Sequence, residues 1–400
     1  MKPIHIALVF GSTRPVPATL GGATQTMLTN LIDENEKIGN FIFHVFSYYE
    51  KSAVDASRRY QNTSFYYYVP SALDKLYSLF FRMLRKLSNH RIYIRSRFIK
   101  WCSTKMPSTL DYIIIEGNYF QVEQMKSLSA TPLILHIHID ALYKGVERSK
   151  EISNACQAII TISNYCANRV ESIQPCNKGK VYVLKNCIDT KHFSPSKTQT
   201  IRNAVRSELG ISKKAFTFIF CGRLCDDKGI KELVEAISEI KDEKCALIVV
   251  GSNAYKDGKK DSFVKGLEKL AKNSHVPIVF TGYIDQEKLP EYYAAADVAV
   301  IPSKCNEAAG NVTIEALSCG LPVICSSQGG IPEYADKRAS IHVKADDNFK
   351  NSLRIALETI RDNDKMYYNM RNEARLVALK HDKCNYYKDF SDIIKSIDKL

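Results

Sequence analysis

Two glutamates separated by seven residues have the types and the spacing to do chemistry together. Glu307 lies in an irregular stretch that contains a glycine, and Glu315 lies in a short segment with helical character. Asn311 can cap the start of this helix, and Gly320 can end it. The first backbone N–H groups of the helix would then point toward the region that both carboxylates line, which suits a phosphate flanked by hydroxyl groups. A glutamate favoured by the helix dipole is the simpler alternative.

Two cations upstream occupy positions from which they can reach the same ligand. Arg223 follows the strand-like segment 217–221, and Lys228 precedes a helix-like segment that begins near Ile230. An arginine can bind a diphosphate with two parallel hydrogen bonds, and a lysine adds a point charge. The alternative is that both are solvated loop cations.

These segments resemble the G-R-x4-K-G and E-x7-E motifs of retaining glycosyltransferases with the GT-B fold, family 4 (glycosyl transferases group 1). The resemblance implies that Arg223 and Lys228 neutralise the leaving nucleoside diphosphate. It also implies that Glu315 binds the ribose hydroxyls and that Glu307 binds the hydroxyls of the donor sugar.

The resemblance extends to backbone groups that would contact the donor. The amides that would approach the phosphates belong to Gly310, Asn311 and Val312. The base would lie against Tyr283 and Ile284, which follow a strand-like segment. The family often has Gly-Phe where this chain has Ala308-Ala309. The Ala-Ala version resembles bacterial lipopolysaccharide and exopolysaccharide transferases, and the identity of the donor sugar stays open.

A pair of glycines, Gly21 and Gly22, follows the first strand-like segment and precedes a helix. Paired glycines let a backbone approach a ligand closely. The segment is not G-x-G-x-x-G, so it does not support a nicotinamide site. In the family this loop borders the diphosphate, which assigns Gly22 to the donor; a plain turn is the alternative.

His136 and His138 alternate on a strand-like segment and therefore share one face. No further cluster in the sequence completes a metal shell. The resemblance instead makes His138 the family's histidine close to the reacting sugar.

Asp362-Asn363-Asp364 looks like a D-x-D metal motif, but it lies between helical segments and is interpreted as a surface turn. Ser163 is interpreted as a helix N-cap. We therefore predict no metal and no cofactor.

Strand-like and helix-like segments alternate in two blocks, which predicts two doubly wound parallel-sheet domains of the α/β class. The expected boundaries are 1–194 for an N-terminal Rossmann-like acceptor domain and 195–380 for a C-terminal Rossmann-like donor domain. A helix at about 381–400 would pack back on the first domain. In the GT-B fold the two domains face one another across a cleft, where the ligands of open sheets bind.

The formal net charge is +13 at pH 7, and most of the excess lies in the first half of the chain. Twelve cysteines without a C-x-x-C pair indicate reduced thiols and a cytoplasmic protein. The N-terminus has too short an apolar run for a signal peptide, and no run is long enough to span a membrane.

The segment 73–105 combines basic and aromatic residues, and no acidic residue occurs between 75 and 105. Apolar residues recur with helical spacing over 73–87, so this helix can lie on an anionic bilayer at the inner face of the cell membrane. Packing against its own domain and binding to nucleic acid are the alternatives, the second without a recognised binding module.

The prediction is a metal-independent glycosyltransferase of the EC 2.4 class that moves a sugar, preferably from a UDP-sugar, to a lipid-linked or membrane-associated glycan in bacterial surface polysaccharide assembly. Arg223 and Lys228 would stabilise the leaving group, while Glu307 and His138 orient the sugar. The alternatives are a GT-B enzyme with a small soluble acceptor, a non-catalytic partner subunit and a nucleic-acid binder.

Overall fold

The structure is a computed structural model that describes residues 3–89, 95–195, 199–241, 244–253 and 262–398. It divides into two compact units, which we call the N-terminal unit (Met1–Asn186 with Lys383–Leu400) and the C-terminal unit (Cys187–Asp382). The division falls after Asn186, earlier in the chain than the expected boundary at 194/195. Part of the basic tract, 90–94, lies outside the described residues.

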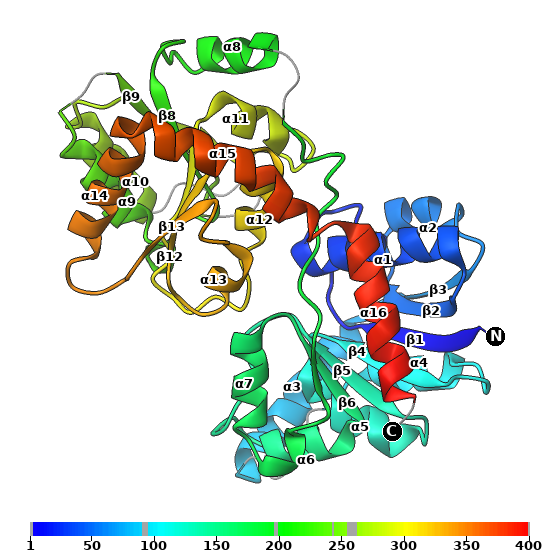
Figure 1. The fold of residues 1–400 in the computed structure, drawn as a ribbon. Helices are drawn as coiled ribbons and strands as arrows, with labels where there is room; N and C mark the ends of the chain where they lie inside the picture. The colour runs from blue at the N-terminus through cyan, green and yellow to red at the C-terminus, as the bar shows by residue number, and fades with distance from the viewer. Residues whose placement is uncertain (1–2, 90–94, 196–198, 242–243, 254–261, 399–400) are drawn as a thin grey trace. The chain divides into compact units, whose positions relative to one another are not determined.

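Seven parallel strands form the sheet of the N-terminal unit, in the spatial order β3-β2-β1-β4-β5-β6-β7 (Figure 1). They are β1 (Ile4–Phe10), β2 (Phe41–Tyr48), β3 (Thr63–Tyr68), β4 (Tyr112–Glu116), β5 (Leu133–Ile137), β6 (Ala158–Thr161) and β7 (Val181–Val183). Central strands such as β4 and β5 are buried along their whole length and are almost entirely apolar, because helices cover both faces of a parallel sheet.

Eight α-helices and two 3-10 turns connect these strands in the described part of the unit. They are α1 (Ala23–Ile38), α2 (Lys51–Ser57), α3 (Ala72–Leu87), α4 (Arg97–Lys105), η1 (Tyr119–Gln121), α5 (Val122–Leu128), α6 (Ser149–Ala155), α7 (Asn164–Glu171), η2 (Pro175–Asn177) and α16 (Lys383–Ile397). The C-terminal helix α16 packs beside α1 (Figure 1). The ring of Phe390 meets that of Phe41 edge-on at 5.5 Å, and the Tyr387 hydroxyl donates to Asn35 Oδ1 at 2.9 Å.

The C-terminal unit has a six-stranded parallel sheet in the order β10-β9-β8-β11-β12-β13. Its strands are β8 (Phe216–Cys221), β9 (Cys245–Val250), β10 (Ile278–Gly282), β11 (Val298–Ile301), β12 (Val323–Ser326) and β13 (Ser340–Val343). Its helices are α8 (Gln199–Glu208), η3 (Asp226–Lys228), α9 (Ile230–Ser238), α10 (Ser262–Lys272), α11 (Leu289–Ala295), α12 (Asn311–Ser318), α13 (Ile331–Tyr334), α14 (Phe349–Asp362) and α15 (Asp364–Leu379).

The predicted α/β class with two parallel sheets is confirmed, but two strands escaped the sequence analysis. Both β3 and β13 are edge strands, and neither is a continuous apolar run. The aromatic residues of β3 were not recognised as a strand, although Tyr66 stacks on Phe46 of β2 at 4.7 Å. In β13 a serine and a histidine interrupt the pattern. Edge strands are half-covered, so their sequences show little of the apolar continuity that marks a central strand.

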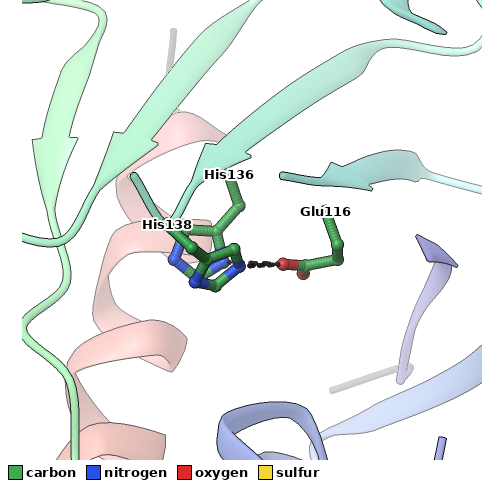
Figure 2. Close-up of side chains that lie close together, drawn as sticks. All are labelled: Glu116, His136 and His138. Carbon is green, nitrogen blue, oxygen red and sulfur yellow. Dashed lines mark hydrogen bonds and ion pairs between the residues drawn. The ribbon is translucent and has the colours of Figure 1, made fainter. Parts of the chain in front are cut away.

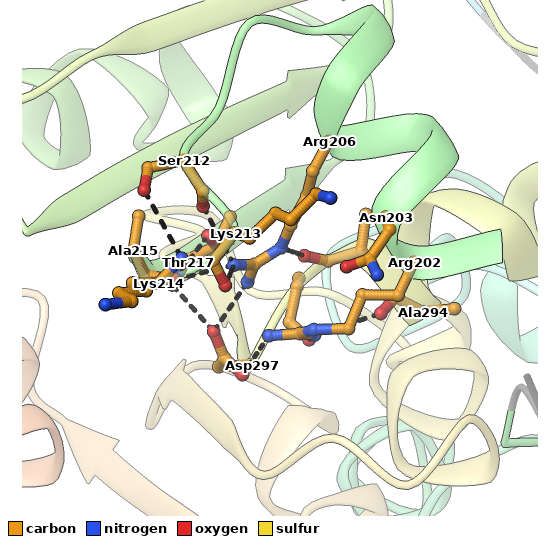
Figure 3. A network of polar contacts seen from close by, with 12 residues as sticks. Arg202, Asn203, Arg206, Ser212, Lys213, Lys214, Ala215, Thr217, Ala294 and Asp297 are labelled. Atoms are coloured by element: carbon orange, nitrogen blue, oxygen red, sulfur yellow. Dashed lines mark hydrogen bonds and ion pairs between the residues drawn. The ribbon is translucent and has the colours of Figure 1, made fainter. Parts of the chain in front are cut away.

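A buried network of charge holds α8 against the sheet of the C-terminal unit (Figure 3). The Asp297 carboxylate accepts hydrogen bonds from Arg202 at 2.6 Å, from Arg206 at 2.9 Å and from the Thr217 amide at 2.8 Å. Arg206 is fully buried and also donates to four backbone carbonyls, including that of Ala295. Both arginines are therefore paired with the same carboxylate, in a site where Arg206 is fully buried and Arg202 keeps 17% of its side chain exposed.

We expect Asp297→Ala to destabilise the protein by about 3–5 kcal/mol, because Arg206 would keep a buried charge without its counter-ion. For a unit of this size the melting temperature would fall by about 6–20 °C. The matched control is Arg338→Met, which breaks an exposed ion pair with Asp336 and should melt close to wild type. Equal melting temperatures for both variants would contradict the expectation; differential scanning calorimetry measures them.

Candidate active site

Lys228 and Glu307 form an ion pair in the C-terminal unit, with 2.9 Å between Lys228 Nζ and Glu307 Oε1. Both side chains are about one-fifth exposed, so the pair is sheltered but reachable from solvent. Ser303 also donates its hydroxyl hydrogen to the Glu307 carboxylate. The structure thus brings together one predicted cation and one predicted glutamate that are far apart in the sequence.

The loops that carry Lys228 and Glu307 lie close to one another. Two glycines and hydrogen bonds to one carbonyl make this contact possible. The Asp227 carbonyl accepts from the amides of Lys304 at 2.8 Å and Cys305 at 3.2 Å. A Cβ at Gly229, whose φ is 66°, would lie 1.8 Å from the Pro302 carbonyl oxygen. A Cβ at Gly329 would similarly meet the Glu307 backbone. Only glycine permits this backbone contact, so the loop positions depend on it.

Glu315 lies on α12 with its carboxylate turned into the unit. Its Oε2 accepts a hydrogen bond from the Tyr293 hydroxyl at 3.0 Å, and Tyr293 is fully buried. Burial raises the pKa of Glu315 to about 7, against a smaller lowering effect of the Tyr293 hydrogen bond. The carboxylate is therefore a strong acceptor held in a poorly solvated position, which suits paired ribose hydroxyls.

The start of α12 differs in one detail from the expectation. Asn311 is the first helical residue rather than the cap, because Gly310 occupies the cap position and no side chain caps the helix. The amides of Thr313 and Ile314 already donate to the Gly310 carbonyl. Asn311 and Val312 precede them in the first turn, where backbone N–H groups point along the axis toward a potential anion.

A cavity of about 210 Å³ lies at the carboxyl edge of the C-terminal sheet. Its lining includes Arg223 after β8, Gly251 after β9, and Tyr283 with Ile284 after β10. Three predicted donor residues thus surround one hollow, at the edge where parallel sheets bind ligands. Cys221 also lines it and interacts with both Tyr293 and Glu315, so Glu315 lies near the same hollow.

The N-terminal unit contains a buried cluster that the sequence analysis found only in part (Figure 2). Glu116 Oε2 lies 2.7 Å from His138 Nε2 and 3.1 Å from His136 Nδ1. The parallel register of β4 and β5 places Glu116 opposite His136, and His138 follows β5. The sequence analysis named the two histidines but missed Glu116, which ends the neighbouring strand β4.

Electrostatics favour a charged Glu116 and a neutral His138. Burial acts to raise the pKa of Glu116, but the two histidines outweigh it and lower that pKa to about 2. Burial and the neighbouring His136 lower the pKa of His138 to about 4. His138 is then neutral at pH 7 and donates Nε2–H to Glu116, which leaves Nδ1 as an acceptor. This buried Nδ1 has no hydrogen-bond partner among the described residues.

The same cluster bears on the prediction that the enzyme uses no metal. The ligand atoms of Glu116, His136 and His138 all lie within 4.8 Å of one another, so three side chains could hold a divalent ion. The sequence analysis rejected a metal because no third ligand was evident, and that reason was wrong. The hydrogen bonds to Glu116 and a bound metal would involve the same three side chains.

Three further sequence interpretations can be compared with the structure. Ser163 caps α7, because its hydroxyl accepts from the Cys166 amide. Asn363 caps α15, so the exposed Asp362–Asp364 segment is a surface turn. Gly22 precedes α1 with a φ of 112°, and a Cβ there would meet the Gln25 side chain at 2.2 Å. Gly22 and His138 belong to the N-terminal unit, and the other predicted site residues belong to the C-terminal unit.

Comparison with protein families matches residues 201–377 to the model described as Glycosyl transferases group 1. The chain carries a glycosyl transferases group 1 domain. This domain covers nearly all of the C-terminal unit, including Arg223, Lys228, Glu307 and Glu315. The protein is accordingly a glycosyltransferase, of the EC 2.4 class.

Curated relatives of this glycosyltransferase cover most of the chain. Spore coat protein SA of Bacillus subtilis is 25% identical over 369 residues, which are 90% of this chain and 89% of that protein. The lipopolysaccharide 1,2-N-acetylglucosaminetransferase of Salmonella typhimurium is 28% identical over 218 residues, covering 52% of this chain and 54% of that enzyme.

Solved structures share the GT-B fold with the glycosyltransferase. Anabaena Alr3699/HepE in complex with UDP-glucose has a TM-score of 0.73 at 16% identity, covering 99% of this chain and all of that one. Sucrose-phosphate synthase from Thermosynechococcus elongatus has a TM-score of 0.72 at 18% identity, covering 99% of both chains. At these identities the likeness shows the fold, and the predicted GT-B fold is confirmed.

Proposed function

We propose that this glycosyltransferase takes its sugar from a nucleotide sugar, with UDP as the preferred nucleoside diphosphate, and retains the anomeric configuration. The observation that carries the proposal is the Lys228–Glu307 ion pair. It combines a cation for the departing diphosphate with a carboxylate for the hydroxyls of the sugar. The cavity lined by Arg223, Tyr283 and Ile284 supports a nucleoside site in the same unit. The UDP-glucose complex of the Anabaena protein supports UDP.

In the proposed reaction, the bond between the anomeric carbon and the phosphate oxygen breaks as the acceptor oxygen attacks from the same face. The acceptor hydroxyl gives its proton to the departing phosphate oxygen, so no protein nucleophile is required. Arg223, Lys228 and the first amides of α12 at Gly310, Asn311 and Val312 stabilise the charge that develops on the diphosphate. These cations take the place of a metal ion. Glu315 binds the ribose hydroxyls, Glu307 binds hydroxyls of the sugar, and His138 accepts a sugar hydroxyl hydrogen at Nδ1.

Glu116 has a positioning role in this proposal, because it determines which nitrogen of His138 carries the proton. We expect Glu116→Gln to lower kcat by about 10–100-fold, since the glutamine can accept only one histidine N–H well and donates its own hydrogens toward the other. Nitrogen-15 NMR should show His138 as the Nε2–H tautomer in wild type and a changed tautomer in the variant. The control is Glu123→Gln, which disturbs an ion pair with Arg148 away from the cluster. Wild-type kcat and tautomer in Glu116→Gln would contradict the role.

A turnover experiment tests the function as a whole. Purified protein is incubated with UDP-glucose or another nucleotide sugar, and the released nucleoside diphosphate is measured with and without EDTA. Release that is slow without acceptor and unaffected by EDTA is expected. Loss of activity with EDTA, restored by a divalent ion, would contradict metal independence. Binding of nucleotides without any release would favour the non-catalytic partner subunit.

We propose that the acceptor is a lipid-linked or membrane-associated glycan of a bacterial surface polysaccharide. The Salmonella lipopolysaccharide transferase among the relatives supports this acceptor class. A helix surface supports it as well. The apolar residues of α3 that are more than half exposed form a stripe, in which each member has another member three or four residues away: Leu73, Leu76, Leu79, Phe80, Met83 and Leu87. Such a stripe beside basic residues suits an anionic bilayer.

The basic residues of α3 do not all face solvent. Lys75, Arg82 and Lys86 are exposed, whereas Arg85 is buried. Arg85 instead pairs with Glu147 at 2.5 Å and lies over the ring of Phe120. No helix in the described parts of the chain has the length and apolar character to cross a bilayer.

We expect wild-type protein to sediment with vesicles that contain anionic phospholipid and to bind neutral vesicles much more weakly. Replacing Leu76 and Leu79 by glutamine should weaken vesicle binding by about 100-fold or more, because each buried leucine contributes about 1.5 kcal/mol or more. The matched control is Leu376→Gln, an equally exposed leucine on α15. A loss of similar size in the control would contradict a specific role of α3.

A further inference from the structure

A cavity of about 250 Å³ lies at the carboxyl edge of the N-terminal sheet. Its lining comes from neighbouring strands: Gly11 follows β1, Tyr48 and Tyr68 end β2 and β3, and Asn118 follows β4. Ligands of parallel α/β sheets bind at this edge. None of the residues assigned above to the nucleotide sugar lines this cavity.

Three arginines contribute to the lining from two parts of the chain. Arg82 comes from α3, Arg95 precedes α4, and Arg97 begins α4. One carboxylate, that of Asp74, is also present; it accepts from the Tyr68 hydroxyl at 2.6 Å and lies 3.6 Å from Arg97 Nε. Three guanidinium groups against one carboxylate make the lining positive, so it suits an anion.

A buried carboxamide gives an independent indication of a ligand. Gln121 lines the cavity and is 7% exposed, and its Oε1 has no hydrogen-bond partner among the described residues. Gly11 leaves room for it, because a Cβ there would lie 2.4 Å from Gln121 Nε2. A buried polar atom without a partner is costly, and a ligand hydroxyl would satisfy it.

We propose that this cavity binds a phosphoryl group of the acceptor substrate, with Arg82, Arg95 and Arg97 on its oxygens and Gln121 on a neighbouring hydroxyl. The oxygens of a phosphoryl group accept the parallel N–H donors of guanidinium groups, so a lining with three arginines suits it. The rings of Tyr48, Tyr77, Phe98 and Phe120 complete the lining and suit the apolar faces of a sugar. The proposal rests on the proposed function, since it names the acceptor class of the same enzyme. The phosphoryl group belongs either to a lipid carrier or to a soluble sugar phosphate.

The chain contains a natural reporter for this cavity. Trp101 is its single tryptophan, and its ring lies 5.2 Å from that of Tyr68 and 6.2 Å from that of Phe98, both of which line the cavity. Binding in the cavity should therefore change the tryptophan fluorescence. The full chain is first saturated with UDP, so that the donor cations are occupied, and is then titrated with inorganic pyrophosphate.

Arg82→Gln is expected to raise the apparent Kd for pyrophosphate by about tenfold or more, because it removes a charge-assisted contact. Lys86→Gln is the matched control, since it removes the same charge from the same helix but does not line the cavity. Gln121→Leu should weaken binding of a sugar phosphate more than binding of pyrophosphate. UDP binding is measured in each sample by thermal shift and should be unchanged, which separates this proposal from the donor site.

Two results would overturn the proposal: no fluorescence change with pyrophosphate in a UDP-saturated sample, or an equal loss of affinity in Arg82→Gln and Lys86→Gln. A second titration uses phosphatidylcholine vesicles with and without a polyprenyl phosphate. A response that requires the polyprenyl phosphate and is lost in Arg82→Gln assigns the phosphoryl group to a lipid carrier. A response to soluble phosphates alone assigns it to a soluble acceptor.

Discussion

Glu315→Ala is expected to abolish the thermal stabilisation of this glycosyltransferase by UDP. At a UDP concentration of 100 Kd, binding to the folded state alone stabilises a protein by about 2.7 kcal/mol, which raises the melting temperature by about 5–10 °C here. Hydrogen bonds to a charged carboxylate contribute about 1.5–3 kcal/mol each. Loss of two such bonds from the ribose raises Kd by about 100-fold or more, so the shift disappears at the same UDP concentration. Differential scanning fluorimetry measures both proteins.

Ionisation of the Glu315 carboxyl group should destabilise the unliganded protein as the pH rises. The folded-state pKa of Glu315, about 7, lies above its usual value of 4.5, so the folded state holds the proton more tightly. Its effect on stability is therefore absent below about pH 4.5 and becomes unfavourable as the pH rises through about 7. Because Glu315 is partly exposed, we expect a cost on the order of 1–3 kcal/mol at about pH 8.

Glu315→Gln separates the two effects in one variant. Glutamine stays neutral and can still accept from Tyr293, so the variant should melt above wild type at about pH 8 and equal it at about pH 5. It should also bind UDP more weakly at the higher pH. A variant that melts below wild type at both pH values would show that the carboxylate serves the fold rather than the ligand.

Lys228→Met is expected to lower kcat by about 10²–10³-fold, because it removes a cation that faces the charge developing on the leaving diphosphate. KM for the nucleotide sugar should rise less, since Arg223 and Glu315 still bind the ground state.

Glu307→Gln should also lower kcat but should keep UDP affinity near wild type, because UDP lacks the sugar that Glu307 is proposed to bind. Initial rates of UDP release give both parameters.

Lys304→Met is the matched control for Lys228→Met. Lys304 lies near the same loop, where it pairs with Asp226 at 2.9 Å and Glu232 at 2.7 Å. Lys304→Met removes the same charge from the same region but keeps the ion pair between Lys228 and Glu307. If kcat fell equally in both lysine variants, a general loss of positive charge or of loop structure would explain the result, and a specific role for Lys228 would be contradicted.

The sequence by itself was sufficient for the fold class and for the order of the donor motifs. Apolar runs of β1, β4 and β8 are visible because central parallel strands are buried on both faces. Arg223 and Lys228 follow one such run directly, and Glu307 and Glu315 keep their spacing. All of these signals are local, so each can be read within a few residues.

The tertiary structure alone decided which distant groups meet. The register between β4 and β5 places Glu116 beside His136 and His138. No local sequence pattern predicts the register of two strands. The packing of α3 and α4 gathers Arg82, Arg95 and Arg97 around one cavity while it turns Arg85 inward. Burial against Tyr293 sets the pKa of Glu315. Each of these depends on contacts between residues far apart in the chain, and such contacts set the burial and charge that periodicity and spacing do not contain.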